Sequence, residues 1–157
     1  MMIGFAVMRL QPLHKGHKKI IDLMLKENDK AILVIGSKDA QDEKNPYSFK
    51  ERLKMVHQVY QEQIKKGKLL VLGINDIHNP PKWAQFIKTH LPLPATKYYC
   101  GTGQDAPLFK KEGFSTIIIN RCDLKISGTD IREKIKKNDI SWQEDIPPQI
   151  HNLIVTH

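Results

Sequence analysis

The sequence predicts an α/β fold: a single domain, over residues 1–157, with a five-stranded parallel sheet and helices on both faces. Short apolar runs alternate with helical patterns along the whole chain. The runs are rich in β-branched residues and nearly continuous, as in strands that are buried on both faces. No linker interrupts this alternation, so we expect no second domain.

Five apolar segments are predicted strands: residues 2–8, 30–37, 68–76, 96–101 and 115–120. Helix candidates lie between them. The first follows residues 11–17, and the next is marked by apolar residues at steps of three and four: Phe49, Leu53, Val56, Tyr60 and Ile64. Shorter candidates cover 81–91 and 107–113, and the second of these ends on Gly113 as a C-cap. Residues 128–139 follow the fifth strand, and a helix near 147–155 closes the chain.

Composition narrows the functional classes. Lysine and arginine number 25 against 17 acidic residues, a net charge of +8, which favours an anionic partner, either nucleic acid or a phosphorylated small molecule. No signal peptide is recognisable, and no apolar stretch approaches the roughly 18 residues of a membrane span. Cys100 and Cys122 are too few for a disulfide framework, so we expect reduced thiols and a cytoplasmic protein.

Parallel sheets bind ligands at the carboxyl ends of their strands, which directs attention to the loop after the first strand. There His14 and His17 flank Gly16 at the start of a helix. The pair fits three interpretations: surface histidines, a metal site completed by Cys100 or Cys122, or a phosphate site. A helix N-terminus attracts anions, and Gly16 would let the backbone approach a phosphate closely.

A second loop favours the phosphate interpretation. "ISGTDIR" (126–132) also follows a strand and opens a helix, with Ser127 and Thr129 as N-cap donors and Arg132 in the first turn. Alone it fits an ordinary cap equally well. Together the two loops place anion-binding side chains at two helix N-termini on one edge of the sheet.

Five stretches, in this order, resemble the nucleotidylyltransferase superfamily: "RLQPLHKGH" (9–17), "NPYSFKER" (45–52), "NDIHNPPKW" (75–83), "GTGQDAPLFKKEGF" (101–114) and "ISGTDIR". Within that superfamily the chain is most similar to the archaeal-type nicotinamide-nucleotide adenylyltransferases. The resemblance implies a Rossmann-like sheet of order 3-2-1-4-5. It also implies direct transfer of AMP from ATP to nicotinamide mononucleotide (NMN), with release of pyrophosphate and no covalent enzyme intermediate.

The resemblance also implies a role for each matching residue. His14, His17 and Arg132 would be catalytic, and His17 would stabilise the transition state at the α-phosphate. The ATP-binding residues would be Arg9, His14, His17, Gly101, Gly103, Asp105, Ile126, Ser127, Thr129 and Arg132. Asp76, Trp83 and Arg52 would bind the acceptor, with a tryptophan face suited to a pyridinium ring.

The resemblance further implies Mg²⁺ held mainly by substrate oxygens and water, with no protein metal ligand. A homo-oligomer is expected, with neither a membrane nor a nucleic-acid partner. Two departures from the family pattern stand out. "MRLQP" (8–12) replaces Gly-Arg-Phe-Gln-Pro, and Pro80 occupies the position of an asparagine in the acceptor site.

Three other functions remain as alternatives. "GTGQDA" (101–106), with Asp123 downstream, fits a dinucleotide-binding fingerprint and so a dehydrogenase. Other adenylyl- or cytidylyltransferases of the superfamily act on phosphopantetheine or on sugar or polyol phosphates. The positive charge also fits a non-catalytic binder of nucleotides or nucleic acid. No Walker A sequence is present, which argues against a P-loop enzyme.

Overall fold

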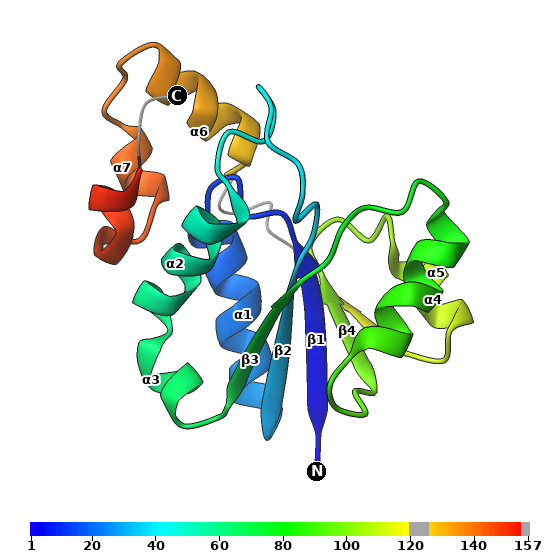
Figure 1. Ribbon diagram of the computed structural model, residues 1–157. Coiled ribbons are helices and arrows are strands. Elements are labelled where there is room, and N and C mark those ends of the chain that lie inside the picture. The colour runs from blue at the N-terminus through cyan, green and yellow to red at the C-terminus, as the bar shows by residue number, and fades with distance from the viewer. Residues whose placement is uncertain (120–125, 155–157) are drawn as a thin grey trace.

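The computed structural model describes residues 1–119 and 126–154. Five parallel strands form one sheet of order β3-β2-β1-β4-β5, which confirms the predicted α/β fold and strand order (Figure 1). The described elements are β1 (Ile3–Met8), α1 (Lys15–Glu27), β2 (Lys30–Ile35), α2 (Phe49–Val59), α3 (Gln61–Lys65), β3 (Leu69–Gly73), α4 (Pro80–His90), β4 (Lys97–Cys100), α5 (Ala106–Lys111), β5 (Ser115–Ile118), α6 (Gly128–Lys136), α7 (Trp142–Asp145) and the 3-10 helix η1 (Pro148–Leu153).

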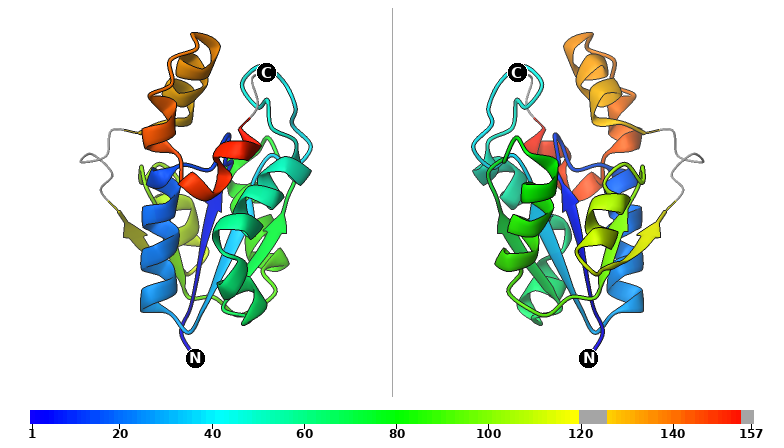
Figure 2. Two further views of the ribbon diagram at one scale, coloured as in Figure 1. Left: turned by 90° about the vertical axis from the view of Figure 1, so that its left-hand side faces the viewer. Right: turned by 90° about the vertical axis from the view of Figure 1, so that its right-hand side faces the viewer.

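Helices cover both faces of the sheet (Figures 1 and 2). On one face, α1 and α2 bury Ile21, Met24 and Met55 against alternate strand residues such as Leu33. On the other face, α4 and α5 bury a second cluster that includes Phe109. Because neighbouring residues of a strand point to opposite faces, both must be apolar, and this produces the nearly continuous apolar runs of the sequence.

Three local features differ from the sequence-based expectation. The predicted strands run on too far at their carboxyl ends, since β2 stops at Ile35 and β3 at Gly73. The apolar stripe from Phe49 belongs to two helices, α2 and α3, which meet at Tyr60. The fifth strand is an edge strand rather than a doubly buried one, and its Ile118 is 58% exposed.

Two sequence signals mark the ends of helices: the one at Gly113 was predicted, and the one at Asn79 was not. Gly113 follows α5 with φ 95°, a backbone conformation that glycine adopts without steric cost. Asn79 is the N-cap of α4, where its side chain accepts a hydrogen bond from Lys82 N at 3.2 Å, and Pro80 is the first helical residue. Pro80 therefore serves the start of a helix at the position where the family pattern has an asparagine. Some residues named in the sequence analysis lie outside the described residues: Asn120 of the predicted fifth strand, Cys122, Asp123, and residue 155 of the predicted last helix.

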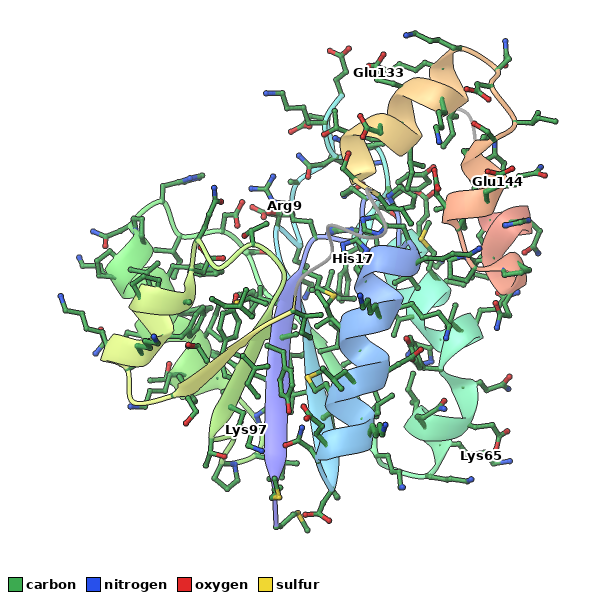
Figure 3. The ribbon with its side chains drawn as sticks, turned by 180° about the vertical axis from the view of Figure 1, so that it is seen from behind. Arg9, His17, Lys65, Lys97, Glu133 and Glu144 are labelled. Carbon is green, nitrogen blue, oxygen red and sulfur yellow. The ribbon has the colours of Figure 1, made fainter. Side chains whose placement is uncertain are left out.

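The carboxyl ends of the strands gather the loops that carry the sequence motifs. Arg9, directly after β1, and His17, in the first turn of α1, lie near this end, whereas Lys65 and Lys97 lie toward the opposite end (Figure 3). Backbone hydrogen bonds join neighbouring loops, from Gly36 N to Met8 O and from Lys38 N to Ile74 O. Within the described residues, no helix is both long and apolar enough to cross a membrane.

Candidate active site

The two histidines of the first loop form a reciprocal cap at the start of α1. His14 is the N-cap, and its Nδ1 accepts hydrogen bonds from Gly16 N (3.0 Å) and His17 N (3.3 Å). His17 Nδ1 in turn accepts from His14 N at 3.2 Å. The imidazole rings stack with their centroids 3.7 Å apart. This is the capping-box arrangement, with histidines in place of the usual serine and glutamate.

The cap determines which nitrogen of each ring carries the proton. Both Nδ1 atoms act as acceptors, so the proton of each neutral imidazole is assigned to Nε2. The helix therefore fixes the orientation of both rings and assigns the donor role in each ring to Nε2–H. Hydrogen-bond donors that are oriented in advance stabilise charge that develops on a phosphate during reaction.

The second motif loop reaches the first through Arg132. Its Nη1 donates to Gln11 O at 2.7 Å, and its Nη2 donates to Thr129 Oγ1 at 3.3 Å. Ser127 is the N-cap of α6 and accepts a hydrogen bond from Asp130 N. A Cβ atom on Gly128 would lie 2.9 Å from Arg132 Nη1 and 3.1 Å from Gln11 O, so only glycine fits the close approach of these two loops.

Gln11 also ties the first loop to the loop before α2. Its side chain donates to Tyr47 O and accepts from Tyr47 N, both at 2.9 Å, and the bonds are buried. The Gln11–Pro12 peptide bond is cis. The two motif loops and the loop before α2 thus share one set of hydrogen bonds.

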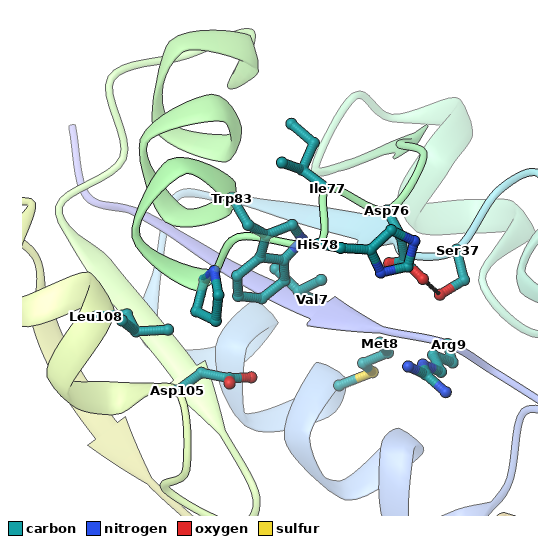
Figure 4. A pocket seen from close by; sticks show the side chains of 12 residues that line it. Val7, Met8, Arg9, Ser37, Asp76, Ile77, His78, Trp83, Asp105 and Leu108 are labelled. Carbon is teal, nitrogen blue, oxygen red and sulfur yellow. Dashed lines mark hydrogen bonds between the residues drawn. The ribbon is translucent and has the colours of Figure 1, made fainter.

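Three adjoining cavities open at this end of the sheet. A cavity of about 270 Å³, which we call the phosphate cavity, lies between the two motif loops and is lined by Arg9, Leu10, Gln11, His14, His17, Lys44, Asn45, Ser127, Gly128, Thr129 and Arg132. A second, of about 360 Å³, lies along β1 and β4; it includes Tyr98, Gly101 and Asp105, and we call it the β4 cavity. A third, of about 380 Å³, lies by α4, includes Asp76, Trp83 and Asp105, and is called the α4 cavity (Figure 4).

The three cavities share lining residues, of which Val7, Met8 and Asp105 are common to the α4 and β4 cavities. Arg9 lines all three, and His17 lines both the phosphate cavity and the β4 cavity. Arg9 is the residue that the linings of all three cavities have in common. Burial lowers the pKa of the Arg132 and Arg52 guanidinium groups, and the nearby charge of Arg9 lowers both further. This mutual repulsion favours an anion beside Arg9.

The α4 cavity combines acidic groups with an aromatic wall. Trp83 is half-buried and packs edge-on against Phe109, with ring centroids 5.4 Å apart. The Asp105 side chain points into the cavity (Figure 4), and burial raises the pKa of its carboxyl group. The Asp76 carboxylate accepts a hydrogen bond from Ser37 Oγ at 2.7 Å. The cavity thus suits a flat group that carries positive charge.

Arg52 occupies a different environment from the one that the resemblance implied. Its side chain is 0% exposed and lines none of the three cavities. Its guanidinium donates to five backbone carbonyl oxygens: Arg9 O (2.8 Å), Gly36 O (2.8 Å), Ser37 O (2.9 Å), Ser48 O (3.3 Å) and Lys38 O (3.4 Å). All five N–H groups are used, so this arginine clamps the loops that surround the cavities.

Two other predicted residues also lie away from the cavity walls. Gly103 has φ 77°, and a Cβ atom there would lie 3.0 Å from the Ile118 side chain. Ile126 is partly buried and packs against the hydrophobic core. The remaining predicted site residues each line at least one of the three cavities.

The lining residues that the sequence interpretation did not single out include three polar ones from one loop. Lys44 and Asn45 line the phosphate cavity, and Ser37 lines the α4 cavity. All three belong to the long polar loop after β2. A lysine in a loop at the carboxyl edge could have been singled out as a phosphate ligand, but no spacing signal separates Lys44 from its charged neighbours.

A family model described as cytidylyltransferase-like matches residues 9–134 of the chain. The chain is 31% identical to the nicotinamide-nucleotide adenylyltransferase of Picrophilus torridus over 155 residues, which cover 98% of the chain and 90% of that relative. It is 30% identical to the enzyme of the same name from Thermococcus sibiricus, with coverage of 98% and 83%.

Among solved structures, the chain is similar to a bifunctional NMN adenylyltransferase/ADP ribose pyrophosphatase from Francisella tularensis complexed with AMP and a manganese ion. The TM-score is 0.74 and the sequence identity is 21%. The match covers 92% of this chain but only 44% of the larger protein. At this identity the likeness supports the fold.

Replacing Arg52 by lysine tests whether it clamps loops or binds substrate. Lysine offers three donors from one point and cannot reach five separated carbonyls. Because buried carbonyls that lose their donors are costly, we expect Arg52→Lys to lower the free energy of unfolding by at least about 2 kcal/mol. Urea unfolding measures this change, with the exposed Arg9→Lys as the matched control, expected within about 0.5 kcal/mol of the parent. An Arg52→Lys protein as stable as that control would contradict the clamp.

Proposed function

The chain belongs to the cytidylyltransferase-like family and, within it, to the nicotinamide-nucleotide adenylyltransferases, and we propose that it joins ATP and NMN to give NAD and pyrophosphate. The observation that carries this proposal is the phosphate cavity, where two helix N-termini bring the His14–His17 pair and Arg132 together. Backbone N–H groups, imidazole donors and a guanidinium are the groups that bind phosphate.

The connections between the cavities suggest how ATP binds. The β- and γ-phosphates would occupy the phosphate cavity, beside Lys44, Thr129 and Arg132. The adenosine would lie in the β4 cavity along Gly101. His17 lines both cavities, so its Nε2–H would reach the α-phosphate that joins the two parts of ATP. It could then donate to the α-phosphoryl oxygens as their charge grows in the transition state.

The acceptor would bind with its ring in the α4 cavity and its phosphate toward Arg9. An oxygen of that phosphate attacks the α-phosphorus of ATP, the new phosphorus–oxygen bond forms, and the bond to the β-phosphate oxygen breaks as pyrophosphate leaves. Arg9 lines all three cavities and would hold the two phosphates together. The two negatively charged reactants repel each other, so positioning and charge neutralisation supply the catalysis.

The donor groups of the phosphate cavity do not fit a resident metal ion. Among the described residues, its lining contains arginine, lysine, histidine and hydroxyl groups but no carboxylate. Within residues 1–119 and 126–154, no group of three or more potential metal ligands occurs. We propose that Mg²⁺ enters as the Mg·ATP substrate, coordinated by phosphate oxygens and water.

The experiment that tests the proposed reaction measures pyrophosphate release with Mg·ATP and a panel of acceptors. NMN should support turnover, whereas phosphopantetheine and polyol phosphates should not. Turnover with a phosphate acceptor that lacks an aromatic ring, and none with NMN, would contradict the acceptor assignment.

Substitution of His17 tests its role at the α-phosphate. We expect His17→Ala to lower kcat by roughly 100-fold or more, as the loss of a transition-state donor does, with little change in ATP binding. The control is His17→Gln, because glutamine at this position also completes a capping box and so preserves the start of α1. Its unfolding temperature should match the parent, while its kcat should still fall. Full activity in a folded His17→Ala protein would contradict the proposed role.

Arg132→Ala should weaken ATP and pyrophosphate binding but spare AMP, because the arginine would contact only the terminal phosphates. A charge-assisted hydrogen bond contributes roughly 1.5–3 kcal/mol, so the dissociation constants should rise at least about tenfold. Isothermal titration calorimetry with the three ligands measures the difference. Equal losses for AMP and ATP would show that Arg132 does not bind the terminal phosphates.

Trp83→Ala should weaken NMN binding by a few-fold to about thirtyfold, because a cation over an aromatic face contributes roughly 0.5–2 kcal/mol. ATP binding should hardly change. The reduced nucleotide, whose ring is uncharged, should lose less than NMN. A destabilised variant that binds NMN and ATP equally badly would assign Trp83 to core packing with Phe109 instead.

A further inference from the structure

Ser37 lies at the junction of the α4 cavity and the clamped loops, and no motif drew attention to it. Its side chain is 2% exposed, and it follows directly after β2 and Gly36. Its backbone has φ 49°, in the left-handed region that side chains other than glycine, asparagine and aspartate adopt rarely and at a cost. Such a conformation persists where the surroundings enforce it.

Arg52 supplies that enforcement. Its two Nη atoms donate to the carbonyl oxygens of three consecutive residues, Gly36, Ser37 and Lys38, at 2.8, 2.9 and 3.4 Å. Lys38 N donates to Ile74 O at 2.8 Å, which ties this segment to the end of β3. The carbonyl groups on either side of the left-handed residue are therefore held, and the direction of the Ser37 side chain is fixed.

The fixed hydroxyl meets the carboxylate of Asp76. Ser37 Oγ donates to Asp76 Oδ2 at 2.7 Å, a short charge-assisted bond between the loops after β2 and β3 (Figure 4). Asp76 itself is exposed in the loop that follows β3, so without this bond its side chain would be free to sample other rotamers. Both residues line the α4 cavity.

We propose that Ser37 is a positioning residue for the acceptor: held by Arg52, it aims the Asp76 carboxylate into the α4 cavity, where that carboxylate meets the positively charged ring of NMN. This rests on the proposed function, because it assigns the ring to that cavity. A group held in place before binding loses less freedom when the ligand arrives, so the bond should contribute to affinity for NMN and not to affinity for ATP.

Replacing Ser37 by glycine gives a sharp test, because glycine removes the hydroxyl yet accepts φ 49° without cost. Ser37→Gly should raise the KM for NMN about fivefold to tenfold and leave the KM for ATP unchanged. Its unfolding temperature should equal or exceed that of the parent. Ser37→Ala should raise the KM for NMN similarly but be less stable than Ser37→Gly. The matched control is Asn138→Gly, at an exposed site with φ 54° after α6, which should alter neither KM.

A double-mutant cycle tests whether Ser37 acts through Asp76. In an Asp76→Ala background, Ser37→Gly should cause no further rise in the KM for NMN. A rise as large as in the parent would overturn the proposal, and so would a Ser37→Gly enzyme with an unchanged KM for NMN.

Crystal structures of the parent and Ser37→Gly proteins without substrates provide a readout that does not depend on the reaction. The Asp76 carboxylate should leave its single position in the variant, and an unchanged position would overturn the positioning role. If the parent protein makes no NAD from NMN, the proposed function fails, whereas the effect of Ser37 on Asp76 is still decided by these structures.

Discussion

The buried guanidinium of Arg52 is the constraint on which the geometry of the site depends. The loops after β1 and β2 leave the sheet while still covered by protein, so their carbonyl groups cannot rely on water for hydrogen bonds. One side chain serves the carbonyls of Arg9, Gly36, Ser37, Lys38 and Ser48 together. The capping box of Ser48 and Glu51 starts α2 one turn before Arg52 and so directs the arginine toward the sheet edge. Arg9, which lines all three cavities, is one of the residues whose backbone carbonyl Arg52 holds.

The architecture could be predicted from the sequence because it depends on patterns that repeat. The alternation of apolar runs and helical stripes predicted five strands in one parallel sheet, and the resemblance supplied the order 3-2-1-4-5, which the structure confirms. The ends of the strands could not be predicted. Residues 36 and 37 directly follow an apolar run in sequence, but β2 stops at Ile35 and Ser37 has a positive φ. The carbonyl of Ser37 is held by Arg52, fifteen residues away. A tertiary hydrogen bond of this kind leaves no local signal.

The site shows the same division between what spacing reveals and what only the fold reveals. His14, His17 and Arg132 were singled out because histidines and arginine at helix starts have a recognisable chemistry. That the imidazoles form the cap of α1 themselves was not foreseen, because serine, threonine, aspartate and asparagine are the expected N-cap residues. The motif that contains Arg52 could be recognised in the sequence but the direction of its side chain could not, so binding of the acceptor was the natural expectation.

Charge is divided between the cavities in a way that the net value of +8 does not reveal. In the part of the chain that the structure describes, the lining of the phosphate cavity contains Arg9, Lys44 and Arg132 but no acid, whereas the α4 cavity contains Asp76 and Asp105 beside Trp83. A nucleotide with a cationic ring and an anionic phosphate matches this division only in one orientation, with its ring by the acids and its phosphate toward Arg9. In that orientation the phosphate faces the junction where the α-phosphate of ATP would lie. The same separation of charges that selects the acceptor therefore also directs its attacking oxygen.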